Sequence, residues 1–224
     1  MFDRRLFYAQ VRQAPFGGHL DQGQVNGIEA LLSKGLAEDL DLRWVAYVLG
    51  TAFHETARTM EPIEEYGRGA GRPYGVPDPR TGKTYFGRGF VQLTWEANYA
   101  AMGKLIGADL VDDPALALNL TDATEIIYVG MTDGTFTGGR CKLSDFFDAE
   151  RSDWYNARRI VNGLDQAAAI AGYGLAFYKA ALVAHGHAPA SDTERDRPPG
   201  QPPPETYVDA EKQAVVSAPE PKCC

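Results

Sequence analysis

The chain has 224 residues, a length that suits one good-sized domain followed by a tail. Hydrophobic residues make up 44% of it, an ordinary share for a globular protein, which excludes general disorder. The formal net charge of −8 argues against nucleic acid as a partner, because phosphate recognition relies on clustered cations. No apolar run reaches about 18 residues, so we predict no membrane-spanning segment and no stable membrane insertion.

The first residues and the cysteines bear on the compartment. The opening stretch MFDRRLFYAQVRQAPFGG carries charged and polar residues where a signal peptide needs an apolar core, so we expect synthesis in the cytoplasm. Three cysteines, two of them adjacent at positions 223 and 224, do not predict a disulfide framework. Their spacing does not resemble a zinc site, and we expect neither a metal nor an organic cofactor.

Helical patterns dominate the chain before residue 186. In QVNGIEALLSKGLA the apolar residues follow helical spacing. The next segment, DLDLRWVAYVLGTAFHETA, is almost continuously apolar, which is typical of a central helix, and Asp41 is a plausible N-cap. Three more helices are predicted in TDATEIIYVGMTDG, SDWYNARRIVNG and LDQAAAIAGYGLAFYKAALVAH. The fold class is therefore mainly α.

Two segments depart from the helical pattern. Residues 66–90 are rich in glycine and proline, which interrupt regular elements, so we predict loops and a short hairpin there. Residues 186–224 are rich in proline and charge and lack apolar periodicity, so we predict a disordered tail. The expected organisation is one helical domain over residues 1–185, followed by this tail.

Several glutamates follow the central helix, and they are candidates for acid–base chemistry. Glu55 ends the apolar helix, and Glu61, Glu64 and Glu65 follow shortly after it. Two carboxyl groups in different environments are the minimal apparatus of glycoside hydrolysis. Glu55 is expected to keep its proton and act as the general acid, while a loop glutamate activates water. The alternative is a solvated helix end with His54 as a structural residue, and spacing alone does not select the second acid.

A second cluster of candidate residues lies in YFGRGFVQLTWEANY, residues 85–99. Glycines on both sides of Arg88 allow a tight turn around a fixed cation. Sugars are bound by polar groups for their hydroxyl and amide groups together with flat aromatic faces. This stretch supplies both kinds, in Gln92, Thr94 and Asn98 and in Tyr85, Trp95 and Tyr99. The alternative is a buried turn with core aromatics.

A third motif, ARRIVNG, occupies residues 157–163 and ends in Asn162 followed by Gly163. Asn before Gly is common at turns and helix C-termini, so a structural role is the default interpretation.

Taken together, AFHETARTMEPIEE, YFGRGFVQLTWEANY, GADLVDDPALAL and ARRIVNG occur in the order found in glycoside hydrolase family 19. Over residues 25–182 the chain resembles the compact, disulfide-free, lysozyme-like branch of this family found among phage endolysins. The resemblance implies an α-rich, lysozyme-like fold of two lobes around a cleft, and an inverting mechanism. It departs from the plant members in Ala57 and Arg58, which stand where those enzymes have glycines, and in a missing insertion that carries their base.

The resemblance also implies roles for individual residues. Glu55 matches the general acid, Glu65 best matches the second acid with Glu64 as the alternative, and Thr94 matches a residue that holds the catalytic water. The expected substrate-binding and supporting residues are His54, Tyr85, Arg88, Gln92, Trp95, Asn98 and Asn162.

The predicted function is therefore an inverting endo-glycosidase that cuts β-1,4 bonds of bacterial peptidoglycan, as an endolysin released through a holin-type pore. A chitinase acting on polymers of N-acetylglucosamine is the alternative within this class. A glycan-binding protein without catalytic activity is the alternative from another class. We expect a monomer whose partner is a peptidoglycan or chitin oligosaccharide.

Overall fold

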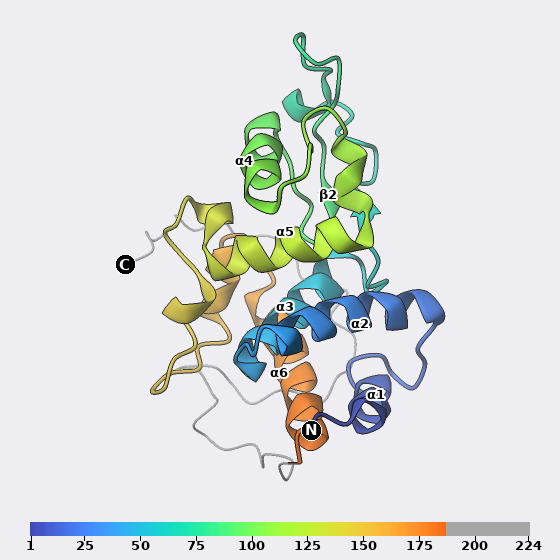
Figure 1. The fold of residues 1–224 in the computed structure, drawn as a ribbon, viewed down its shortest axis with the longest axis vertical. Coiled ribbons are helices and arrows are strands. Elements are labelled where there is room, and N and C mark those ends of the chain that lie inside the picture. The colour runs from blue at the N-terminus through green and yellow to red at the C-terminus, as the bar shows by residue number, and fades with distance from the viewer. Residues whose placement is uncertain (187–224) are drawn as a thin grey trace.

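The computed structural model describes residues 1–186 and shows a mainly α-helical protein, as predicted (Figure 1). Two very short strands and several 3-10 turns connect the helices. Apart from Gly186, the predicted tail lies outside the described residues. The α-helices are α1 (Arg4–Gln13), α2 (Gln22–Ala37), α3 (Leu42–Glu55), α4 (Glu96–Ile106), α5 (Leu120–Thr132) and α6 (Ala167–Ala184), and the strands are β1 (Ile63–Glu64) and β2 (Arg88–Gly89).

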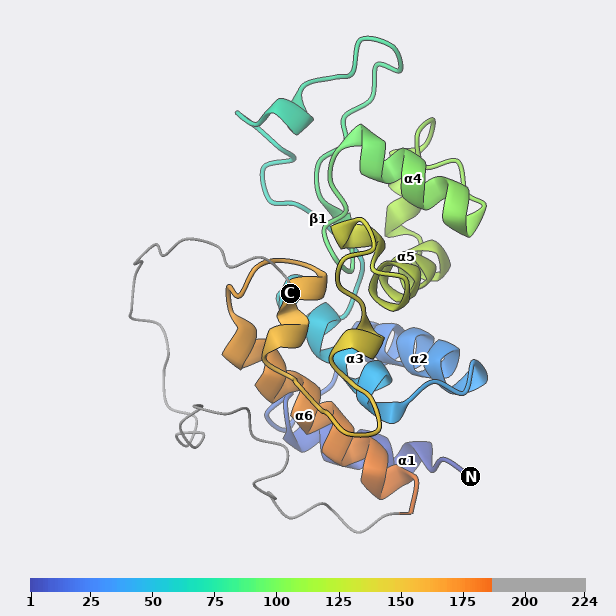
Figure 2. The same ribbon diagram turned by 90° about the vertical axis from the view of Figure 1, so that its left-hand side faces the viewer.

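Helix α3 is the centre of the molecule. All nine residues from Val45 to Phe53 are buried, which explains the almost continuous apolar pattern. Asp41 caps its N-terminus by accepting a hydrogen bond from the Arg43 backbone N–H at 2.8 Å, as predicted. Figure 2 shows α3 between α2 and α6. A Cβ atom at Gly50 would meet the backbone nitrogen of Gly174 at 2.6 Å, so α3 and α6 cross in direct backbone contact.

Helix α6 combines length with apolar character. It is the one helix of the described part that could cross a membrane by length and composition alone. It packs against α1 and α3, and the backbone N–H of Asp3, which caps α1, donates to the Ala184 carbonyl at 2.8 Å. The apolar residues of α6 are therefore accounted for by packing inside the protein.

The elements form two lobes (Figures 1 and 2). One lobe contains α1, α2, α3 and α6, and the other contains β1, β2, the loop between them and α4, with α5 lying between the two. Strands β1 and β2 pair antiparallel, with Ile63 opposite Gly89 and Glu64 opposite Arg88. A short pair of strands therefore exists, as predicted, but its first strand lies just before residues 66–90 and the two strands are joined by a long loop.

The structure differs from the sequence predictions in one helix. The helix predicted in SDWYNARRIVNG is only a 3-10 turn, η5 (Asn156–Ile160). Asp153 accepts a hydrogen bond from the Asn156 backbone N–H at 3.0 Å just before the turn, and Gly163 follows soon after its end.

Candidate active site

Glu55 is the last residue of α3, and a buried arginine holds its side chain. The Arg158 Nη1 donates to Glu55 Oε1 at 2.6 Å, with exposed side-chain fractions of 4% for Arg158 and 17% for Glu55. Arg158 belongs to η5, and its Nε donates to the Asp165 carbonyl at 3.0 Å, which fixes the guanidinium from the other side. The end of the apolar helix therefore presents an ion pair that is largely shielded from water.

His54 precedes Glu55 and contacts α6. Its ring stacks on Tyr173, with 6.4 Å between the ring centroids and an interplanar angle of 27°. Burial lowers the pKa of His54, which is the largest of several effects; Glu55 opposes it and Arg158 adds to it. The neutral imidazole is thereby favoured next to the Glu55–Arg158 pair.

The two candidates for the second acid have different partners. Glu64 lies 2.8 Å from Arg68 Nε and 3.7 Å from Arg88 Nε, so two cations face its carboxylate. Glu65 instead accepts hydrogen bonds from the Tyr74 hydroxyl at 2.9 Å and from the Gly87 backbone N–H at 3.1 Å. These two donors are uncharged and contact different oxygens, so they fix the orientation of the Glu65 carboxylate.

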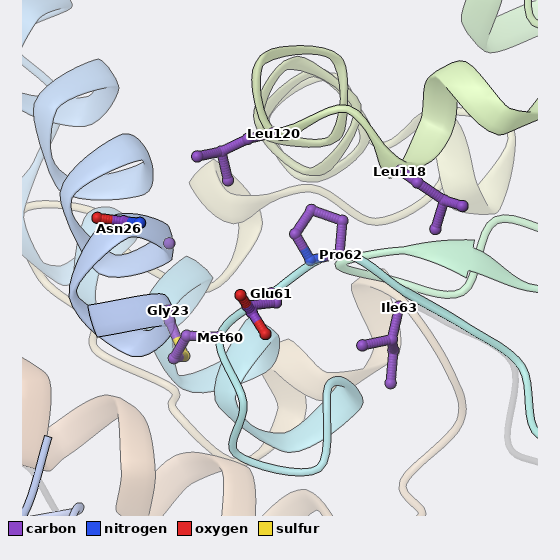
Figure 3. A pocket seen from close by; sticks show the side chains of 9 residues that line it. Gly23, Asn26, Met60, Glu61, Pro62, Ile63, Leu118 and Leu120 are labelled. Carbon is purple, nitrogen blue, oxygen red and sulfur yellow. The ribbon is translucent and has the colours of Figure 1, made fainter. Parts of the chain in front are cut away.

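Glu61, the remaining glutamate of this segment, faces a separate cavity of about 360 Å³ (Figure 3). The cavity lies between α2, the segment from Met60 to Ile63, and the start of α5. Its lining consists of Gly23, Asn26, Gly27, Met60, Glu61, Pro62, Ile63, Leu118 and Leu120. None of the other three candidate glutamates lines this cavity, so the structure separates Glu61 from them.

The polar residues of the QLTWEANY stretch build its turn. The Gln92 Nε2 donates to the carbonyls of Ile63 at 3.1 Å and Gly89 at 3.4 Å. The Thr94 hydroxyl donates to the Gln92 carbonyl at 2.7 Å, and the Asn98 Nδ2 donates to the Thr94 carbonyl at 2.8 Å. The structure brings these three side chains together, and the bonds connect β2 to α4. The side-chain oxygens of Gln92, Thr94 and Asn98 can each still accept a hydrogen bond.

Tyr85 and Arg88 support the same lobe from inside. Tyr85 is buried, and its hydroxyl donates to the Val111 carbonyl at 3.0 Å. Arg88 is also buried, with its guanidinium 3.6 Å from the centroid of the Phe86 ring and its Nη1 donating to the Tyr99 hydroxyl at 3.1 Å. The Tyr85 hydroxyl and the Arg88 Nη1 are therefore engaged within the protein, whereas the buried Arg88 Nε makes no hydrogen bond.

Trp95 and Asn162 are exposed. Trp95 is 49% exposed, and Asn162 uses its Oδ1 to accept from the Gly163 backbone N–H at 2.9 Å. No group of three or more His, Cys, Asp or Glu side chains in residues 1–186 is arranged to hold a metal ion.

The sequence motifs did not indicate Arg158 or Tyr74 as site residues. Arg158 lies inside the motif ARRIVNG, but the residue of this motif that was interpreted was Asn162. The pairing of Arg158 with Glu55 depends on how η5 folds. Tyr74 is one aromatic in a glycine-rich loop, and no sequence signal connects it to Glu65.

Comparisons with known proteins agree with the motifs. The family model described as Chitinase class I matches residues 46–134. Chitinase 12 of Oryza sativa subsp. japonica is 43% identical over 102 residues, which cover 38% of this chain and 31% of that protein. Endochitinase 1 of Theobroma cacao is 57% identical over 35 residues, which cover 16% of this chain and 11% of that protein. The chain thus covers less than a third of either relative.

Chitinase C from Streptomyces griseus HUT6037 is a solved structure similar to this chain, at 19% identity and a TM-score of 0.46 over 82% of this chain and 78% of that one. The matched residues 46–134 include His54, Glu55, Glu65 and the stretch from Gln92 to Trp95. The family model thus confirms the predicted resemblance to glycoside hydrolase family 19 over residues 46–134.

Proposed function

We propose that this chain is an inverting glycoside hydrolase that cleaves β-1,4 bonds between N-acetylglucosamine units, with chitin-type oligosaccharides as substrates. The observation that carries the proposal is that Glu55 and Glu65 are each held by dedicated partners, one on α3 and the other after β1. The similarity to proteins named as chitinases supports the choice of substrate.

Glu55 is the general acid in this mechanism. Arg158 occupies its Oε1, so Oε2 carries the proton and delivers it to the departing glycosidic oxygen. The carboxylate that forms is then paired with a guanidinium already in place. The ion pair is strongest after the proton has left, so Arg158 stabilises the transition state more than the ground state.

Glu65 is the general base. The Tyr74 hydroxyl and the Gly87 backbone N–H set the direction of its carboxylate, and Thr94 supplies a hydroxyl oxygen that can accept a hydrogen bond from water. The activated water attacks the sugar from the face opposite to the leaving group, which requires acid and base to be about 6.5–9.5 Å apart.

The test is the substitution Glu55→Gln, assayed with the hexamer of N-acetylglucosamine. It removes the proton donor at almost constant size, so we expect kcat to fall by about 10²–10⁴-fold while binding persists. Glu61→Gln is the matched control, because Glu61 faces the separate cavity. Hydrolysis by Glu55→Gln at the wild-type rate would contradict the proposal, and binding without turnover in the wild type would indicate a glycan-binding protein.

The second acid is tested in the same assay. Glu65→Gln is expected to abolish most turnover, whereas Glu64→Gln removes the partner of Arg68 and Arg88 and is expected to affect turnover less. A product formed first as the α-anomer, observed by NMR, would support inversion. A larger loss of turnover in Glu64→Gln than in Glu65→Gln would assign the base to Glu64.

Peptidoglycan is the second candidate substrate, and the charge of the loop after β1 favours it. Arg68, Arg72, Arg80 and Lys83 lie in residues 66–83 with a single acid, Asp78, and peptide stems are often anionic. Release of reducing ends from purified cell walls, compared with release from chitin, tests this choice. An endolysin role and release through a holin-type pore remain predictions that depend on activity towards cell walls.

A further inference from the structure

Tyr74 contacts both the proposed base and an exposed aromatic ring. It lies in a short 3-10 turn, η1 (Pro73–Gly75), within the loop between β1 and β2. Its hydroxyl donates to Glu65 Oε1 at 2.9 Å, while its ring meets the Trp95 ring edge-on, with 5.3 Å between centroids and an interplanar angle of 80°. One side chain therefore connects the orientation of a carboxylate to the position of an exposed tryptophan.

Trp95 is held in an unusual backbone conformation. Its φ angle is +75°, a region that bulky residues rarely adopt and that is strained for them. Its backbone N–H donates to the Tyr85 carbonyl at 2.9 Å, so the conformation is fixed by the buried part of the lobe. Half of the side chain nevertheless remains exposed, so core packing does not account for the strain. An exposed, fixed indole face is suited to the C–H face of a sugar ring.

The loop that carries Tyr74 has few other apolar anchors nearby. Tyr66 is 87% exposed and Val76 is 64% exposed, and Gly67, Gly69 and Gly71 all have positive φ angles. The Tyr85 backbone N–H donates to the Tyr74 carbonyl at 3.2 Å and anchors the backbone, while the ring contact with Trp95 restrains the direction of the Tyr74 hydroxyl. The bond from Tyr74 to Glu65 also raises the pKa of the Tyr74 phenol, because ionisation would place two negative charges side by side.

We propose that Tyr74 is a positioning residue that fixes the Glu65 carboxylate for attack by water, and that a sugar ring stacked on Trp95 strengthens this restraint. The proposal rests on the proposed function of Glu65 as general base. Stacking on Trp95 buries the free face of the indole and immobilises its edge contact with Tyr74. Substrate binding at the Trp95 ring is thereby coupled to the orientation of the Glu65 carboxylate.

The first test compares Tyr74→Phe with Tyr66→Phe. Tyr74→Phe keeps the ring against Trp95 and removes only the hydroxyl, so we expect kcat to fall about tenfold with KM within about twofold of the wild type. Tyr66→Phe removes a hydroxyl from the same loop and is expected to leave both constants unchanged. An unchanged kcat for Tyr74→Phe, or an effect on KM alone, would overturn the proposal.

The second test concerns the coupling to Trp95. Trp95→Ala is expected to raise KM. Tyr74→Phe should lower kcat by a smaller factor in the Trp95→Ala background than in the wild type, because the restraint on the Tyr74 hydroxyl is already weakened there. An equal loss of kcat on Tyr74→Phe in the two backgrounds would overturn the coupling.

A third measurement needs no substrate and separates this proposal from the proposed function. The titration of Tyr74 can be followed by NMR of ring-labelled tyrosine and assigned with Tyr74→Phe. In Glu65→Gln the pKa of Tyr74 is expected to fall towards its ordinary value of about 10. An unchanged pKa of Tyr74 in Glu65→Gln would overturn the hydrogen bond between Tyr74 and Glu65. A wild type that is inactive on both polymers, with the expected titration shift, refutes the proposed function instead.

Discussion

The residues just after Glu55 have an unusual backbone. Ala57, Arg58 and Met60 have φ angles of +50°, +71° and +56°, the left-handed region that favours glycine. The chain thus keeps the sharp exit from α3 and accepts strain at the residues that follow the proposed acid.

This strain leads to a prediction for Ala57→Gly. Ala57 is exposed and its φ is +50°, so glycine relieves strain and removes little packing, and we expect stability to rise by about 0.5–1 kcal/mol. Ala101→Gly is the matched control, because Ala101 is exposed within α4, where the same change costs about 1 kcal/mol. Urea unfolding measures both, and a destabilised Ala57→Gly would contradict the interpretation.

Residue roles could be predicted from sequence only where they follow from one local element. The apolar pattern placed Glu55 at the end of a buried helix, and the helix is there with Asp41 as its cap. The partner of Glu55 could not be predicted, because Arg158 lies 103 residues away and reaches it through η5. The choice between Glu64 and Glu65 depends on the register of β1 and β2, which spacing does not reveal.

At the scale of elements, glycines on one face of α2 determine how closely the chain after α3 can pass. A Cβ atom at Gly27 would meet the Met60 carbonyl oxygen at 1.6 Å, and one at Gly23 would meet Glu61 Oε1 at 2.6 Å. Gly23 and Gly27 stand one helical turn apart on the side that lines the cavity of Figure 3. The segment that leads from Glu55 to β1 therefore lies directly on the α2 backbone.

We predict that Gly27→Ala is destabilising by at least about 2 kcal/mol, because the clash is with a backbone carbonyl that cannot rotate away. Gly172→Ala is the control within another helix. An added Cβ there meets nothing within 4 Å, so the alanine is expected to stabilise α6 by about 0.5–1 kcal/mol. Thermal and urea unfolding should show opposite signs for the two, and equal effects would refute the packing argument.

The elements differ in how well their patterns predicted them. The four segments predicted around α2, α3, α5 and α6 are helices, because each carries enough apolar residues to show a period. Helix α1 buries only Phe7 and Val11, and the motif of α4 was interpreted for its chemistry, so neither was predicted. Of the helix predicted in SDWYNARRIVNG the structure keeps only the 3-10 turn η5.

At the scale of the whole molecule, His54 is expected to make stability depend on pH. Its pKa is lowered in the folded state, so between that value and the unfolded value of about 6.5 the unfolded chain binds more protons. Stability should therefore be complete above about pH 6.5 and decrease as the pH falls towards the folded pKa. His54→Gln should remove this part of the decrease.

The measurement is urea unfolding at pH 7.5 and at pH 5 for the wild type and the variant. His19→Gln replaces an exposed histidine and serves as the control for loss of the side chain. The same pH dependence in His54→Gln and in the wild type would show that His54 does not contribute.

The loop between the two strands begins and ends at adjacent backbone atoms. The Glu65 N–H donates to the Gly87 carbonyl at 2.7 Å, and Ile63 and Glu64 pair with Gly89 and Arg88 just outside it. Because the ends are already joined, a change in loop length adds little closure entropy, about 0.6 kcal/mol for each doubling. Loops of other lengths can therefore join the same two strands while Glu55 and Arg158 stay in place, provided that each loop supplies a hydrogen-bond donor to Glu65 as Tyr74 does.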